Sequence, residues 1–456
     1  MSLERELIDA VGSPHVEVLD RDDRPDPGQP GPAAREPDTG RNARAPAQAP
    51  PPAAPHRWRV TPGSAAEVAE VIRRARAHKA AVHPIGAGGR PTRVADDRPR
   101  VYIATRRLDQ VIQLDETSLL VHAQAGLTGL DLERILAPRN LSIGDYPPVV
   151  LTSSLGGILA VRTPGKSSAR HGFFEDAVVG VSAVLADGRT VHTRIAPRRS
   201  TGPDLARVLC GSEGTIGFIT SAVLRIHLRP ESRLVAAYLL PSIDAAINAV
   251  YLALREEAAP SGIRIYDARE AAVHYPGLAL PAGHALLCAG TAGPTDLATC
   301  DRDLLTSAVI AEGGTATDTA LAELWWRRLH AGEPTPGPQP TLQVMATPSR
   351  LRAVYHAIAR ELPALGGTLR AHISRFDADG AVMFLTPERT GTGTGNDSAA
   401  AEAIAAAAEI VAAAERAAQA ACGWLLGARA QELDTYLRAL RDALDPDRIM
   451  NPGALA

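Results

Sequence analysis

The chain has 456 residues with a formal net charge of -3, and 45% of its residues are hydrophobic. This length exceeds what one hydrophobic core usually supports, so we expect two domains. The nearly balanced charge excludes the strongly basic surface that nucleic acids and anionic membranes attract, so we expect no nucleic acid partner.

Cysteine usage and apolar runs narrow the class further. The four cysteines, Cys210, Cys288, Cys300 and Cys422, lie far apart and form no CxxC pair, which disfavours a disulfide framework and a metal site. No apolar stretch reaches the roughly 18 residues that span a bilayer, and the N-terminus lacks a basic start followed by an apolar run. We therefore expect a cytoplasmic protein without an integral membrane segment.

The N-terminal segment contains a long stretch that has little to bury. Residues 21–55 are mostly Pro, Ala, Arg and Asp, a composition that cannot offset the chain entropy lost on folding. We expect residues 1–55 to form a disordered Pro/Ala-rich arm that folding does not require, and order to begin near Trp58.

Strands and helices alternate over residues 56–230. Ser64 supplies an N-cap for a helix over residues 65–78, where apolar residues recur at helical spacing. Further helices are predicted over residues 129–136 and 204–209. Strands are predicted over residues 80–85, 101–105, 119–124, 178–186 and 218–226, and Asp187-Gly188 predicts a hairpin to residues 190–194. This mixture indicates an α+β domain.

After residue 230 the pattern starts again and predicts a second, smaller α+β domain over residues 231–390. It contains a strand over residues 234–240, a helix over residues 243–257, and strands over residues 262–267 and 284–290. The Pro-rich residues 333–340 and the Gly/Thr-rich residues 390–396 are predicted loops. An Ala-rich helix over residues 399–421 and a C-terminal tail complete residues 391–456. No internal sequence repeat is evident.

Three glycine-rich segments carry the candidate chemistry. The first holds Gly86, Gly88 and Gly89, which allow backbone N–H groups to approach an anion. Pro91 follows where a dinucleotide-binding Rossmann motif would begin a helix, which disfavours NAD. The second segment holds Ser153, Ser154, Gly156 and Gly157, and the third runs over residues 211–217. Taken alone, each segment is equally consistent with a structural turn.

Taken together, the order and spacing of these segments resemble the FAD domain of the p-cresol methylhydroxylase (vanillyl-alcohol oxidase) type, and within it alkyldihydroxyacetonephosphate synthase. The resemblance implies a two-lobed FAD-binding domain with a cap domain. It also implies FAD contacts from Pro84, Ile85, Gly86, Ala87, Gly88, Gly89, Arg90, Pro148, Ser153, Ser154, Gly156, Gly157, Arg162, His171, Gly172, Asp176, Glu213, Gly214, Thr215, Gly217 and Ile219.

The cap and the tail show weaker similarity to the same family. The strand containing Arg264 resembles an apolar-Arg-apolar-apolar-Asp strand of the family, and His372-Ile-Ser374-Arg375 resembles its His-X-Ser-His strand. The ending from Asp445 to Gly453, which contains Asn451, resembles the family's Asp-Pro-X-X-Ile-X-Asn-Pro-Gly tail.

The chain departs from the synthase at three places. Phe384 stands where the family has a catalytic tyrosine, residues 420–427 contain no histidine where the family has three, and the Pro-rich residues 333–340 replace its phosphate-binding arginine. The resemblance therefore implies an FAD-dependent oxidoreductase with an altered pocket for an unidentified small molecule. A synthase-like enzyme and a non-catalytic flavin-binding protein are the alternatives.

His372 and Arg375 are the candidate catalytic residues. A lone histidine on a strand is more often a packed or surface residue than a base, which is the alternative for His372, and Arg375 either holds an anionic substrate or pairs with Asp377 or Asp379. No histidine adjoins the glycines at 86–89, where related oxidases attach flavin, so we expect noncovalent FAD. We consider a homodimer as its assembly.

Overall fold

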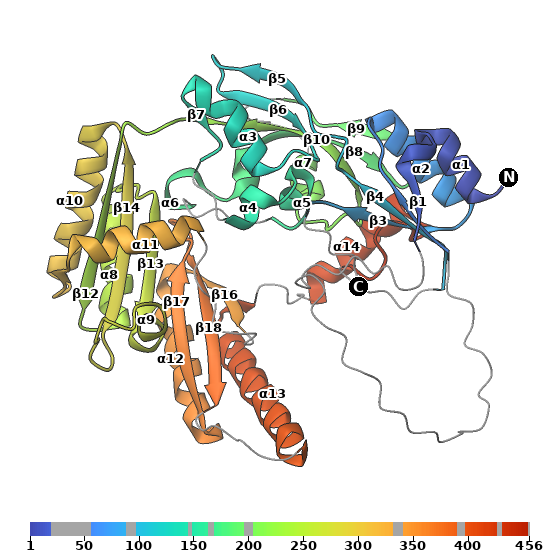
Figure 1. The fold of residues 1–456 in the computed structure, drawn as a ribbon. Helices are drawn as coiled ribbons and strands as arrows, with labels where there is room; N and C mark the ends of the chain where they lie inside the picture. The colour runs from blue at the N-terminus through green and yellow to red at the C-terminus, as the bar shows by residue number, and fades with distance from the viewer. Residues whose placement is uncertain are drawn as a thin grey trace, which may run out of the picture.

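The computed structural model of the chain describes residues 1–19, 56–87, 97–144, 148–162, 168–195, 204–331, 341–389, 397–425 and 431–454. It confirms the α+β fold, with a two-lobed domain and a cap domain beside it (Figure 1).

The first lobe is a four-stranded sheet covered by two helices. Its strand order is β1 (Val16–Val18), β2 (Arg57–Val60), β4 (Arg100–Ala104) and β3 (Ala81–Ile85), in which β4 runs parallel to both β2 and β3. Helix α2 (Ala65–Ala77) begins at Ser64, whose hydroxyl accepts a hydrogen bond from the Glu67 amide. Its buried face packs on the sheet because its apolar residues recur at helical spacing.

The expectation of a disordered arm over residues 1–55 is wrong for residues 1–19. Residues Leu3–Val11 form helix α1, which buries Leu3, Leu7 and Val11. Strand β1 then pairs with β2, with Val16 opposite Val60. Residues 21–55, to which the composition argument applied, lie outside the described residues. The argument overlooked three apolar residues spaced four apart before that stretch.

The second lobe is a five-stranded antiparallel sheet with short helices on one face. Its strand order is β5 (Val111–Asp115), β6 (Leu120–Gln124), β10 (Gly217–Arg225), β8 (Val178–Leu185) and β9 (Thr190–His192). The helices are α3 (Gly129–Leu136), α4 (Pro148–Thr152), α5 (Leu155–Ala160), α6 (Ser168–His171) and α7 (Leu205–Leu209). The short strands β7 (Leu141–Ser142) and β11 (His227–Leu228) pair where the chain leaves for the cap.

The cap domain contains one eight-stranded sheet made of two similar halves. The first half runs β12 (Ser232–Leu240), α8 (Ile243–Arg255), β13 (Gly262–Asp267), β14 (Ala285–Gly293), α10 (Thr295–Ala311) and β15 (Thr315–Ala316). The second runs β16 (Leu342–Ala346), α12 (Pro348–Glu361), β17 (Gly367–Ser374), β18 (Ala381–Arg389), α13 (Asp397–Ala420) and β19 (Trp424–Leu425). The two halves join where β13 pairs with β17. The cap domain therefore contains a structural repeat, although its sequence shows no evident repeat.

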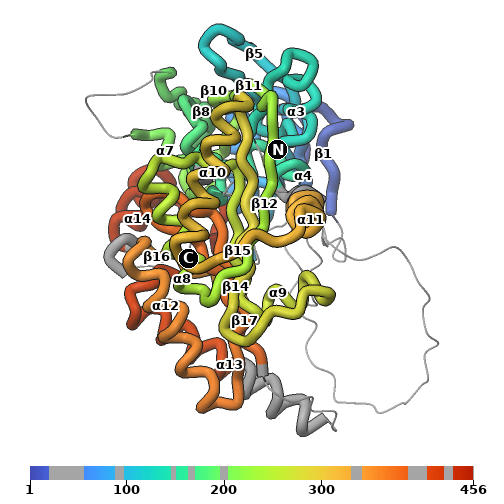
Figure 2. The backbone as a smooth tube through the Cα atoms, turned by 90° about the vertical axis from the view of Figure 1, so that its left-hand side faces the viewer, coloured from blue at the N-terminus to red at the C-terminus, as the bar shows by residue number. Residues whose placement is uncertain are grey.

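The two faces of the cap sheet differ. Helices α8, α10, α12 and α13 cover one face and form the largest hydrophobic core with it, and Figure 2 shows α10 running along β12. Helices α9 (Ala268–His274) and α11 (Thr319–Ala331) pack on the other face. Because β19 is a strand of this sheet and α13 packs on it, the cap domain extends beyond residue 390.

The C-terminal segment returns from the cap to both lobes. Leu440 and Leu444 of helix α14 (Gln431–Leu444) pack against the core of the second lobe. Ile449 and Met450 are buried in the core of the first lobe, where Met450 bridges Val82 of β3. The chain end therefore lies beside β3 and β4 in Figure 1, far along the sequence from them.

Candidate functional site

The three glycine-rich segments meet at one place between the lobes. A Cβ atom on Gly86 would lie 2.4 Å from the Ser154 hydroxyl, and the Ala87 amide donates a hydrogen bond to that hydroxyl at 3.3 Å. A Cβ atom on Gly214 would lie 2.8 Å from Cγ of Pro84. Gly86 therefore packs closely on Ser154, and Gly214 packs closely on Pro84, so backbone from all three segments converges here.

The third segment is held in an unusual backbone conformation. Glu213 and Gly214 have φ angles of 49° and 75°, in the left-handed region. The buried Thr215 hydroxyl donates to the Ser212 carbonyl at 2.7 Å, which closes the turn. Gly217 and Ile219 follow in β10 and are buried.

The predicted residues of α6 and its surroundings have identified partners. Arg162 donates hydrogen bonds to the carbonyls of Cys210 and Arg207, which lie just before the third glycine-rich segment, and so helps to fix the start of that segment. Asp176 accepts from the Phe173 amide and pairs with Arg207 at 2.9 Å, and Gly172 has a φ of 72°.

In the second glycine-rich segment, Gly156 packs against Ala125, while Ser153 and Gly157 are half-buried. Gly88, Gly89 and Arg90 lie outside the described residues, and Pro148 is described only as the start of α4.

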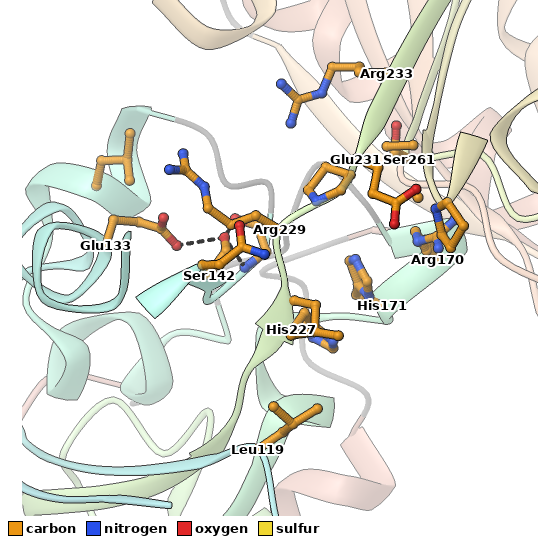
Figure 3. Close-up of a pocket in the computed structure, with 18 residues that line it drawn as sticks. Leu119, Glu133, Ser142, Arg170, His171, His227, Arg229, Glu231, Arg233 and Ser261 are labelled. Atoms are coloured by element: carbon orange, nitrogen blue, oxygen red, sulfur yellow. Dashed lines mark hydrogen bonds between the residues drawn. The ribbon is translucent and has the colours of Figure 1, made fainter. Parts of the chain in front are cut away.

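A cavity of about 490 Å³ lies at the joint between the second lobe and the cap domain (Figure 3). His171 of α6 and His227 of β11 stack in its wall with ring centroids 3.9 Å apart. Burial, and to a lesser degree the neighbouring His227 and Arg170, lowers the pKa of His171 to about 3, so this ring stays neutral at pH 7. Burial also lowers the pKa of His227. Arg170 reaches from the same helix to the cap, where it pairs with Asp301.

The cap face that carries α9 presents both candidate catalytic residues. The His372 ring stacks on the Phe384 ring at a centroid distance of 4.6 Å and an interplanar angle of 11°. The Arg375 guanidinium lies over the same Phe384 ring, 4.8 Å from its centroid. Burial raises the pKa of Asp377 in the turn that follows Arg375, and the charges of Asp379 and Asp176 raise it further.

Glu270 of α9 is the residue that the sequence reasoning missed. Its carboxylate accepts from Nδ1 of His372 and Nε2 of His274, each at 3.1 Å, and pairs with Arg370. Burial alone would raise the pKa of Glu270, but the hydrogen bonds from the two histidines and the Arg370 charge outweigh it and lower that pKa. The only signal in the sequence was its position three residues after Asp267, which caps α9.

Among the residues that the structure describes, no three His, Cys, Asp or Glu side chains are grouped so that they could hold a metal ion. No helix among them is long and apolar enough to cross a membrane.

Two family models match the chain, a FAD binding domain over residues 57–194 and the C-terminal domain of FAD linked oxidases over residues 229–455. An alkyldihydroxyacetonephosphate synthase of Caenorhabditis elegans is 30% identical over 46% of this chain and 36% of its own length. The uncharacterized FAD-linked oxidoreductase YgcU of Escherichia coli (strain K12) is 32% identical over 47% of this chain and 45% of its own length. The chain thus spans less than half the length of these curated relatives.

The fold of the whole chain also has solved counterparts. The structure of p-cresol methylhydroxylase with substrate bound superposes with a TM-score of 0.68 at 15% identity, covering 99% of this chain and 96% of that one. The two matched domains follow one another in the order that the two-lobed domain and the cap domain have here. The chain therefore belongs to the family of FAD-binding oxidoreductases known as the FAD-linked oxidases.

Proposed function

We propose that this protein is an oxidoreductase with noncovalently bound FAD that acts on a small anionic molecule, and that it lacks alkyldihydroxyacetonephosphate synthase activity. The glycine junction at Gly86, Ser154 and Gly214 would hold the diphosphate of FAD, because backbone amides and a hydroxyl group from three segments converge there. When bound, FAD supplies the acceptor for the two electrons that leave the substrate.

The noncovalent state is supported by the position of His83, the histidine nearest to the first glycine segment. It is 1% exposed, its ring stacks on Tyr102, and its Nδ1 atom lies 3.1 Å from the Asn451 side chain. A ring held in this way cannot turn toward a flavin.

Loss of the synthase reaction is supported by one observation, the position of Phe384. The ring lies between His372 and Arg375 on the cap face that carries the candidate residues, so the position itself belongs to the site. Phe384 has no hydroxyl, and a positioned proton donor or acceptor usually contributes roughly a hundredfold to ten-thousandfold to rate.

An anionic substrate is supported by the surroundings of Arg375. Asp377, one of the two aspartates that could pair with Arg375, accepts hydrogen bonds from the amides of Asp379 and Gly380 within its own turn. Burial, together with the nearby Arg264 charge, lowers the pKa of Arg375 to about 10. Two neighbouring guanidinium groups favour a bound carboxylate or phosphate. The φ of 58° at Arg375 adds a strained backbone, which proteins keep where the surroundings enforce it.

His372 is the proposed proton acceptor in this site. Glu270 accepts from its Nδ1 atom, which fixes the orientation of the ring and leaves proton exchange to Nε2. Arg370 keeps Glu270 ionised, so the carboxylate also stabilises the protonated ring that would follow proton transfer.

The test is to mix FAD-loaded protein anaerobically with a panel of hydroxy acids, phosphorylated alcohols and neutral alcohols. We expect an anionic compound to bleach the flavin, and Arg375→Ala to raise the concentration needed at least tenfold, the usual cost of losing a charged partner. Bleaching by neutral alcohols alone would contradict the anionic class. A flavin that no compound reduces would favour a non-catalytic flavin-binding protein.

Two further proposals concern the cellular location and the oligomeric state of the protein. The widely spaced cysteines support a reducing cytoplasm, which cell fractionation would test. Light scattering of purified protein would test the homodimer.

A further inference from the structure

The C-terminal Asn451 contacts two of the three segments that would hold FAD. Its Nδ2 atom donates to the Glu213 carbonyl at 2.6 Å, and its Oδ1 atom lies 3.1 Å from Nδ1 of His83. His83 directly precedes Pro84 and lies three residues before Gly86 in the first lobe, while Glu213 and Gly214 lie in the turn that leads into β10 of the second lobe. One side chain therefore joins the two lobes where their glycine segments meet.

An amide is needed at this position. A backbone carbonyl can only accept, so the atom that faces Glu213 must be the NH₂ group and the atom that faces His83 must be the oxygen. His83 must then carry its proton on Nδ1 and donate it to Asn451. Asn451 also has a φ of 39°, close to the left-handed region that asparagine tolerates better than most residues.

Hydrogen bonds of the C-terminal residues 445–451 fix the position of Asn451. Its amide donates to the Val82 carbonyl at 2.7 Å, and the Val82 amide donates to the Ile449 carbonyl at 2.8 Å, so the tail runs along β3 like an added strand. The fully buried Asp445 accepts from the amides of Ile449 and Met450. These bonds leave the Asn451 side chain little freedom to move.

We infer that Asn451 is a positioning residue for FAD, and that the last turn of the chain sets how tightly the cofactor is retained. Glu213 has a left-handed backbone that is costly for a residue with a side chain, and the bond from Asn451 stabilises it there. Without this bond the Glu213 segment relaxes away from Pro84, and the junction for the diphosphate opens. The inference rests on FAD binding as proposed above and is independent of the substrate.

The experiment measures FAD release from the holoprotein on dilution, by the rise in flavin fluorescence, together with thermal midpoints with and without added FAD. Asn451→Ala should raise the dissociation constant about tenfold or more, because it leaves buried polar partners unsatisfied. Asn451→Asp keeps the volume and the acceptor for His83 but removes the donor to Glu213. It should weaken FAD binding as well, whereas a residue that only filled space would tolerate it.

Asp447→Asn is the matched control, because it breaks the exposed pair with Arg76 in the same turn without touching either segment. It should retain FAD like the wild type. If Asn451→Asp and Asn451→Ala both bind FAD within twofold of the wild type, the inference is overturned while FAD binding stands. Wild-type protein that takes up no FAD at all would overturn both.

Discussion

The docking of α1 on the first lobe can be tested with one substitution, Leu7→Ala. Leu7 is completely buried between α1, α2 and the sheet, and Glu6 beside it pairs with Arg74 and His78 of α2. Removing a buried leucine side chain costs about 2–5 kcal/mol, from the lost transfer free energy and the cavity left behind. For a domain of this size each kcal/mol lowers the thermal midpoint by about 2–4 °C, so we expect a drop of about 4–20 °C.

The assay is thermal unfolding followed by circular dichroism, with Asp9→Ala as the control. Asp9 is exposed on the same helix, and surface substitutions of this kind usually change stability by no more than about 0.5 kcal/mol. If Leu7→Ala unfolds at the wild-type temperature, residues 1–19 are not docked, and the original expectation of a dispensable arm would be restored.

Three other predictions follow from the site. Trichloroacetic acid should release the flavin into the supernatant, and colour that stays in the pellet would contradict noncovalent FAD. The lowered pKa of Glu270 means that its contribution to stability is present above about pH 4.3 and is lost as the pH falls below that value. The thermal midpoint should therefore fall more steeply in acid for the wild type than for Glu270→Gln, which should itself be about 3–5 kcal/mol less stable at pH 7. Phe384→Tyr should form no ether from palmitoyl-dihydroxyacetone phosphate and labelled hexadecanol, and product formation would show that the hydroxyl alone was missing.

Local patterns predicted most elements of the fold because each carried its own signal. The helix from Gly129 to Leu136 and the strand from Gly262 to Asp267 have the predicted bounds, since a threonine cap and an apolar run define them. The hairpin at Asp187-Gly188 was also predicted. Helices α10, α11 and α12 were missed although they are long. These helices pack on the cap sheet, whose strands pair residues that are far apart in the sequence. A prediction from short stretches of sequence cannot see that pairing.

The candidate site divides in the same way. The glycine segments could be recognised from the sequence because the close packing of one segment on another favours glycine itself. The role of Glu270 could not, since it depends on β13 bringing α9 over β17, about a hundred residues later in the chain. The sequence likewise left open whether Arg375 holds an anionic substrate or pairs with Asp377 or Asp379. In the folded turn the Asp377 carboxylate accepts from the amides of Asp379 and Gly380.

The most direct test of the central claim is the visible absorbance of the bound flavin under anaerobic conditions while anionic small molecules are added one at a time. The account predicts that at least one of them bleaches the flavin of the wild type, and that Arg375→Ala requires at least tenfold more of the same compound. A flavin that stays oxidised with every compound, in a protein that forms ether from palmitoyl-dihydroxyacetone phosphate and hexadecanol, would contradict it.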